Sequence, residues 1–323
     1  MLYLKITILG CGRWGSFLAW HFNRLGHSVL LWGRSTSEKL KNLKTTRANA
    51  YLKLPDNILL SSILSDAIDF SDIILIAIQE QNLRELLQCI VSTNYLEKTF
   101  VLCMKGIEIN TCKRLSEVAY EYFKDNAEVA IMVGPGQPTD IINGESTCFI
   151  VDANKKKVSE YIAKSLNSEY IRMQIGNDIV GNEIGAAVNK IIGIAGGILD
   201  GLNHSSLKGL LMVAGTNEIA KLIKSQGGNP KTAYGLSCLG DYQASLYSEH
   251  SNSVSFGKTI VNNKEFNSHV PGVYTAKAIQ KLANKCEISF LLTISQIILK
   301  KERPTKLVDA LLNYNWGIYY END

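Results

Sequence analysis

A glycine-rich hexapeptide near the N-terminus has the spacing needed to bind a dinucleotide. Gly10, Gly12 and Gly15 stand in the segment GCGRWG, directly after a short apolar run and directly before a segment with helical periodicity. In that context glycines let the backbone approach a pyrophosphate closely, and the helix N-terminus presents N–H groups to it. Arg13 and Trp14 lie in the same loop, where either could cover the cofactor, and Trp14 could equally belong to the core.

The end of the second apolar run, residues 28–34, bears on the choice of cofactor. An acidic residue at this place hydrogen-bonds the ribose 2′-hydroxyl of NAD, whereas an arginine accommodates the 2′-phosphate of NADP. This chain has Gly33 and Arg34 here. The sequence therefore predicts NADPH as cofactor, with NADH also open.

A polar pair interrupts a long apolar segment in the second half of the chain. Residues 183–202 have the spacing of a buried helix but contain Asn189 and Lys190. Successive residues on a helix point about 100° apart, so the two side chains cannot face the same way. The pattern leaves open which of them faces a cleft, and an ion pair with Asp200 or Glu249 would be a purely structural explanation of Lys190.

The elements around these residues predict an α/β architecture with two domains. Short continuous apolar runs alternate with helical segments in the first half, which is typical of a doubly wound parallel sheet covered on both faces. From about residue 157 onward we expect helices and no strands. The predicted helices of this half cover residues 183–202, 206–226, 272–286, 287–300 and 305–313. We therefore expect a dinucleotide-binding domain over residues 1–180 and an all-α, substrate-binding domain over residues 181–323.

Composition excludes several classes of function. The chain has 323 residues, 46% of them hydrophobic, and a formal charge of only +4, which gives no case for nucleic acid or a membrane surface. Its seven cysteines form no CxxC pair and its five histidines show no ligand spacing, so we expect no metal site and a reducing, cytoplasmic environment.

A series of motifs along nearly the whole chain resembles the NAD(P)-dependent glycerol-3-phosphate dehydrogenases. The motifs that carry the resemblance, in order, are GCGRWG, WGR, CMKGIE, GPG, EIGAAVNKIIGIAGGILDGL, YGLSCLGD, SFGKTI and PGVYTAKAI. The resemblance implies reduction of dihydroxyacetone phosphate to sn-glycerol 3-phosphate, with a lysine on the interdomain helix handling the proton and a polar, cationic pocket holding the phosphate. The apolar helical half also leads us to expect a homodimer.

Positions that match the family's motifs, and positions beside them, give the expected site. The expected catalytic residues are Lys190, Asn189 and Asp241. The expected cofactor-binding residues are Gly10, Gly12, Arg13, Trp14, Gly15, Arg34, Lys105 and Pro138. The expected substrate-binding residues are Lys105, Gly134, Gly136, Ser251, Asn252, Ser253 and Lys258. His204 and His250 are alternative proton donors, and Tyr247 could narrow the pocket.

The chain departs from the family's pattern at the substrate end. The family has lysine then asparagine where this chain has Asn189 then Lys190, and an arginine where this chain has Asn252. Gly136, Pro138 and Pro271 also replace the usual residues. Three interpretations follow: the family's ordinary activity, a dehydrogenase with a different and unphosphorylated substrate, or a non-catalytic protein that only binds the cofactor.

Overall fold

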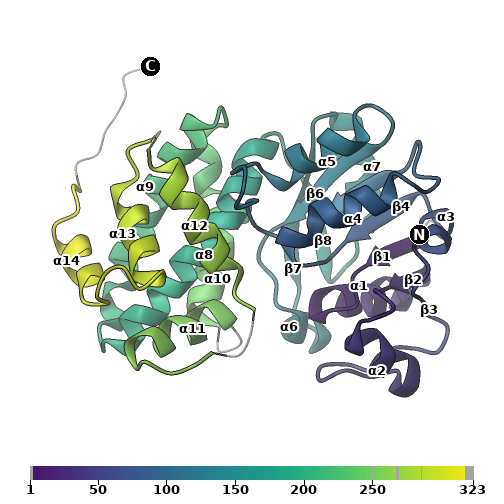
Figure 1. Ribbon diagram of the computed structural model, residues 1–323, viewed down its shortest axis with the longest axis horizontal. Helices are drawn as coiled ribbons and strands as arrows, with labels where there is room; N and C mark the ends of the chain where they lie inside the picture. The colour runs from purple at the N-terminus through teal and green to yellow at the C-terminus, as the bar shows by residue number, and fades with distance from the viewer. Residues whose placement is uncertain (1–2, 249–250, 267–268, 285, 317–323) are drawn as a thin grey trace.

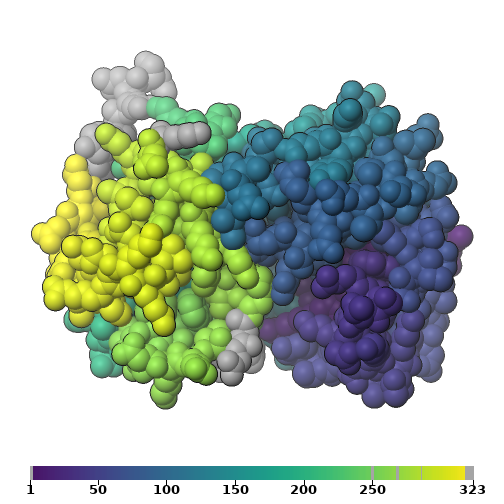
Figure 2. Space-filling model, in the orientation of Figure 1, coloured from purple at the N-terminus to yellow at the C-terminus, as the bar shows by residue number. Residues whose placement is uncertain are grey.

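The computed structural model consists of two lobes, a sheet-containing lobe from the first half of the chain and a helical lobe from the second (Figure 1). It describes residues 3–248, 251–266, 269–284 and 286–316. In the space-filling view the surface dips between the two lobes, and N-terminal residues show beside this indentation (Figure 2).

One eight-stranded sheet organises the first lobe. The strands are β1 (Lys5–Leu9), β2 (Ser28–Trp32), β3 (Leu59–Ser61), β4 (Ile73–Ile76), β5 (Thr99–Leu102), β6 (Glu128–Val133), β7 (Thr147–Ala153) and β8 (Ile171–Ile175). Their order is β3-β2-β1-β4-β5-β6-β7-β8, and every neighbouring pair is parallel except β6 and β7. The order reverses between β1 and β4, which is the point where ligands bind in such sheets. The predicted doubly wound class is thus confirmed, with one antiparallel pair.

Helices cover both faces of this sheet because its central strands are apolar on both sides. All residues of β4 and β5 are buried, as are most of β1 and β6. The helices of this lobe are α1 (Arg13–Arg24), α2 (Glu38–Thr46), α3 (Leu64–Asp69), α4 (Leu83–Ile90), α5 (Leu115–Phe123), α6 (Pro138–Ile142) and α7 (Lys156–Leu166), with a short 3₁₀ turn η1 (Glu80–Asn82). Helices α1 and α7 contribute to the core on one face, and α3, α4 and α5 to the core on the other.

The expectation of no strands beyond residue 157 was wrong. Strand β8 lies in that region and forms the edge of the sheet beside β7. Its Ile171 and Met173 are buried while Arg172 and Gln174 are exposed, so it carries the alternating pattern of an edge strand and lacks a continuous apolar run. The three-residue strand β3 at the opposite edge was also not predicted, because it is too short to show a period.

Helix α8 (Ile179–Gly201) is the central element of the helical lobe. Around it lie α9 (Lys208–Ser225), α10 (Asp241–Tyr247), α11 (Asn252–Val261), α12 (Pro271–Leu282), α13 (Ser289–Ile298) and α14 (Lys306–Leu312), with short turns η2 (Ser205–Leu207), η3 (Pro230–Tyr234) and the π-helical turn η4 (Leu236–Gly240). The backbones of α8 and α11 touch, because a Cβ on Gly197 would lie 2.0 Å from the carbonyl oxygen of Val254. By length and composition α8 could cross a membrane, but 83% of its apolar window is buried inside the protein, as in a core helix.

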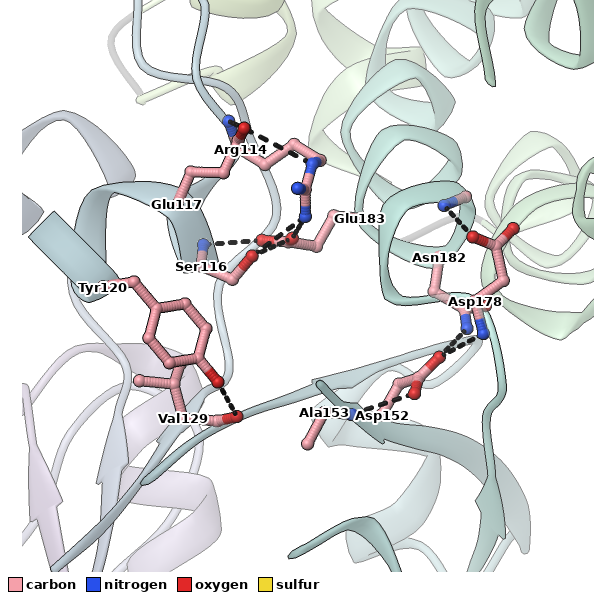
Figure 3. Close-up of polar contacts among 11 residues, drawn as sticks. Arg114, Ser116, Glu117, Tyr120, Val129, Asp152, Ala153, Asp178, Asn182 and Glu183 are labelled. Atoms are coloured by element: carbon pink, nitrogen blue, oxygen red, sulfur yellow. Dashed lines mark hydrogen bonds and ion pairs between the residues drawn. The ribbon is translucent and has the colours of Figure 1, made fainter. Parts of the chain in front are cut away.

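Buried carboxylates join the start of α8 to the sheet lobe (Figure 3). Glu183 accepts hydrogen bonds from the Ser116 backbone N–H at 2.9 Å and from Arg114 Nη1 at 2.7 Å. Asp152 accepts from the Asp178 backbone N–H at 2.9 Å and from Asn182 Nδ2 at 2.7 Å. Burial raises the pKa of Glu183 and of Asp152. These bonds fix the first turns of α8, and therefore the direction in which its next polar residues point.

Candidate active site between the two lobes

The glycine loop between β1 and α1 fits a dinucleotide pyrophosphate. A Cβ on Gly10 would lie 2.4 Å from the carbonyl oxygen of Ala77, and a Cβ on Gly15 would lie 1.7 Å from that of Gly10, so both positions require glycine. A Cβ on Gly12 would meet no described atom within 4 Å, so this side of the loop is open. Helix α1 has no side-chain cap and no acid in its first turn, which leaves its N–H groups and positive end for an anion.

The residues expected to surround the cofactor are distributed around this loop. The Arg13 guanidinium lies 4.4 Å from the centre of the Tyr51 ring, and Trp14 stacks on Phe17 with ring centres 5.2 Å apart. Trp14 therefore packs against its own helix. Arg34 is exposed just beyond the end of β2, and Pro138 is buried at the start of α6.

An ion pair across the two lobes forms the centre of the site. Lys105, which follows β5, donates from Nζ to Asp241 Oδ2 at 2.5 Å and to the carbonyl oxygen of Gly134 at 2.8 Å. Asp241 is the first residue of α10 and is only 3% exposed. The structure thus brings together three residues that the sequence analysis assigned to catalysis or substrate binding.

Asn189 belongs to the same cluster. Its Nδ2 donates to Asp241 Oδ2 at 3.1 Å and to the carbonyl oxygen of Ser237 at 2.8 Å. Both partners can only accept, so the orientation of the amide is determined. The carbonyl oxygen Oδ1 of Asn189 is left buried without a donor among the described residues.

Lys190 also lies near this cluster, on a different side of α8. Its pKa is lowered to about 8, mainly by burial and further by the positive charge of Lys105, against the opposing effect of Asp241. No hydrogen bond or ion pair joins its side chain to any part of the chain that the structure describes. Asp200, one of the two suggested partners, instead pairs with Lys208 at 2.8 Å, and Glu249 lies outside the described residues.

The residues expected at the far end of the substrate are only partly brought together. Ser251 caps α11 by accepting from the Val254 N–H at 3.4 Å, and Ser253 packs against Gly193, one turn along α8 from Lys190. Asn252 is exposed. Lys258 lies 3.7 Å from Asp200, near the other end of α8.

The remaining candidates lie away from the ion pair or outside the described residues. Gly136 packs closely on Phe149, because a Cβ there would lie 2.7 Å from the tip of its ring. His204 is exposed just before η2, Tyr247 is exposed at the end of α10, and His250 lies outside the described residues.

Two residues at the cleft were not singled out in the sequence. Glu80 follows β4, is 3% exposed, and lies 3.4 Å from Nε2 of His269, which belongs to the helical lobe. Its other oxygen, Oε1, has no partner among the described residues. Neither residue stands in a recognisable motif, since their proximity depends on how the two lobes meet. No cluster of potential metal ligands occurs within the described ranges.

Comparison with known proteins agrees with this arrangement. A model of the NAD-dependent glycerol-3-phosphate dehydrogenase N-terminus matches residues 5–159, and a model of the C-terminus of the same enzymes matches residues 178–309. The chain belongs to this family. Glycerol-3-phosphate dehydrogenase [NAD(P)+] of Staphylococcus aureus is 31% identical to this dehydrogenase over 303 residues, which are 90% of this chain and 91% of that protein.

Solved structures confirm the fold of the dehydrogenase. Glycerol-3-phosphate dehydrogenase from Coxiella burnetii superposes with a TM-score of 0.89 at 23% identity, covering 96% of this chain and 99% of that one. The Plasmodium falciparum enzyme gives 0.81 at 20% identity, covering 98% and 97%. The family's enzymes are NAD(P)-dependent oxidoreductases, and the sequence-based assignment to this class is confirmed.

Proposed function

We propose that this dehydrogenase reduces dihydroxyacetone phosphate to sn-glycerol 3-phosphate, with NADPH as the preferred cofactor and NADH as the alternative. The observation that carries the proposal is the Lys105–Asp241 ion pair between the lobes. Asn189 bonds to this pair, and a second lysine, Lys190, lies near it without a partner among the described residues. Two lysines beside one aspartate leave one positive charge uncompensated. Such a site favours a small ketone that carries an anionic group.

The residues of the chain account for the movement of the proton. When bound, the nicotinamide supplies a hydride to the ketone carbon. The ammonium group of Lys105 donates a hydrogen bond to the ketone oxygen and gives it a proton as the alkoxide forms. Asp241 holds Lys105 in position at 2.5 Å and offsets its charge, and Asn189 Nδ2 donates to the same carboxylate oxygen of Asp241. The neutral lysine then takes a proton from solvent, since its side chain is 17% exposed.

Arg34 supports the preference for NADPH. Its guanidinium is exposed beyond β2, where the adenosine ribose lies in this fold, and it has no acidic neighbour bound to it among the described residues. A charge-assisted bond to a 2′-phosphate contributes about 1.5–3 kcal/mol.

The absence of an arginine at Asn252 favours a second candidate, reduction of an unphosphorylated ketone on the same scaffold. Oxidation of NADPH by the purified protein, measured with dihydroxyacetone phosphate and with dihydroxyacetone, separates the two. We expect the phosphorylated ketone to be preferred, and Lys105→Met to lower kcat by roughly 10²–10⁴-fold. Lys39→Met, an exposed lysine on α2, serves as the matched control and leaves kcat unchanged. Preference for dihydroxyacetone would support the second candidate, and tight NADPH binding without turnover would contradict both.

A further inference from the structure

We propose that Asn189 and Lys190 divide recognition of the substrate between them. Lys190 binds the anionic group, and Oδ1 of Asn189 accepts a hydrogen bond from the hydroxyl group. The inference rests on the proposed function, because it concerns the same site.

Lys190 is the cation of this region that has no acceptor in the described part of the chain. Lys105 is paired with Asp241 at 2.5 Å, and Lys208 and Lys258 are both paired with Asp200. A partly buried ammonium group without a partner is unfavourable in the free protein. An anion that enters the site relieves this cost, so the binding free energy depends strongly on Lys190.

The surroundings of Lys190 differ from those of Lys105. Along α8 the residue one turn after Lys190 is Gly193, against which Ser253 of α11 packs. Lys190 therefore lies on the face of α8 that looks toward the start of α11, where first-turn N–H groups add positive potential. Asn252, in the same turn, carries no charge. Lys190 thus supplies a positive charge on this side of the site, where Asn252 supplies none.

Asn189 offers the complementary group for a hydroxyl. It is 2% exposed, and its Nδ2 is already used by Asp241 and Ser237. The amide cannot rotate to exchange its atoms without losing both bonds. A buried acceptor without a donor costs about 1–3 kcal/mol, and a substrate hydroxyl removes that cost.

The first arm of the test needs no turnover. Binding of inorganic phosphate and of glycerol 3-phosphate is measured by calorimetry on native protein, Lys190→Met, Lys190→Arg and the control Lys39→Met, an exposed lysine on α2. We expect Lys190→Met to weaken both ligands by roughly 10–100-fold, Lys190→Arg to retain most of the affinity, and Lys39→Met to change it less than about twofold. Unchanged phosphate binding in Lys190→Met would overturn the assignment of Lys190. If phosphate binding depends on Lys190 but native protein does not reduce dihydroxyacetone phosphate, the proposed function fails and the anion site stands.

The second arm compares dihydroxyacetone phosphate with hydroxyacetone phosphate, which lacks the free hydroxyl. We expect native protein to favour the former by about 10²-fold or more in kcat/KM, and Asn189→Ala to lose most of that preference. Equal preference in native protein would overturn the assignment of Asn189. For Lys190→Met we expect a raised KM with kcat nearly kept. A fall in kcat at unchanged KM would instead assign Lys190 to proton transfer and overturn the division proposed here.

Discussion

Replacing Lys190 with methionine should stabilise the ligand-free protein. Methionine keeps the length and the apolar stem of the side chain but removes the charge. Burial and the charge of Lys105 lower the pKa of Lys190 from 10.5 to about 8. At about 1.4 kcal/mol per pH unit, this means that holding the charged form in the folded state costs about 3 kcal/mol at neutral pH.

The stability gained by Lys190→Met should depend on pH. Because the folded-state pKa lies below the unfolded-state pKa, the unfolded chain binds more protons between pH 8 and 10.5, and native stability rises through that interval. The advantage of Lys190→Met should therefore be about 3 kcal/mol at about pH 7 and fall to about 1 kcal/mol near pH 9.5.

Urea denaturation of native protein and Lys190→Met at these two pH values measures the difference, with Lys39→Met as a control that shows no comparable gain. Saturating phosphate should reduce this advantage at neutral pH by about 1.4–2.7 kcal/mol, because phosphate is expected to bind native protein about 10–100-fold more tightly than Lys190→Met. Equal stability of native protein and Lys190→Met at both pH values would refute the interpretation that this lysine is desolvated and has no partner in the described part of the chain.

Further predictions concern the cofactor loop and the joint between the lobes. Gly12→Ala should leave the free energy of unfolding within about 0.5 kcal/mol, because its Cβ meets no described atom within 4 Å and its φ is −76°, but should weaken NADPH binding at least about tenfold in fluorescence titration. Gly15→Ala should instead destabilise the protein by more than about 3 kcal/mol, because its Cβ would lie 1.7 Å from a backbone oxygen; a mild effect in urea denaturation would contradict this. Arg34→Ala should raise the Kd of NADPH by about 10–100-fold and leave that of NADH unchanged, and an equal loss for both would remove the 2′-phosphate assignment. Glu183→Ala should cost about 3 kcal/mol in urea denaturation, because it leaves Arg114 without its buried partner.

The cofactor domain was predictable because its signals are local. Each central strand is a continuous apolar run, and the glycine loop stands between a strand and a helix within a few residues. Strand β8 was not predicted, because an edge strand exposes alternate residues and its sequence therefore lacks a continuous apolar run. The family assignment rested on a series of motifs along the chain, and it did not require every strand to be predicted.

The inner geometry of the site was not predictable from periodicity. Asn189 and Lys190 lie on different faces of α8, and each face carries small residues. The sequence pattern therefore could not tell which of the two side chains reaches the cleft. The structure places both near Asp241. The π-helical turn η4, which directly precedes Asp241 in the chain, packs against α8 and brings the Ser237 carbonyl to Asn189. The contact between Glu80 and His269 likewise joins residues 189 positions apart, on different lobes.

The central claim is that this dehydrogenase works with asparagine and lysine in exchanged positions. The most direct test is kcat/KM for NADPH-dependent reduction of dihydroxyacetone phosphate, measured for native protein and for the double variant Asn189→Lys, Lys190→Asn. We predict that native protein turns over at least as well as the double variant, because Lys105 and Asn189 are both bonded to Asp241, and in the proposed mechanism these three residues suffice to move the proton. A native protein without activity beside an active double variant would contradict that account.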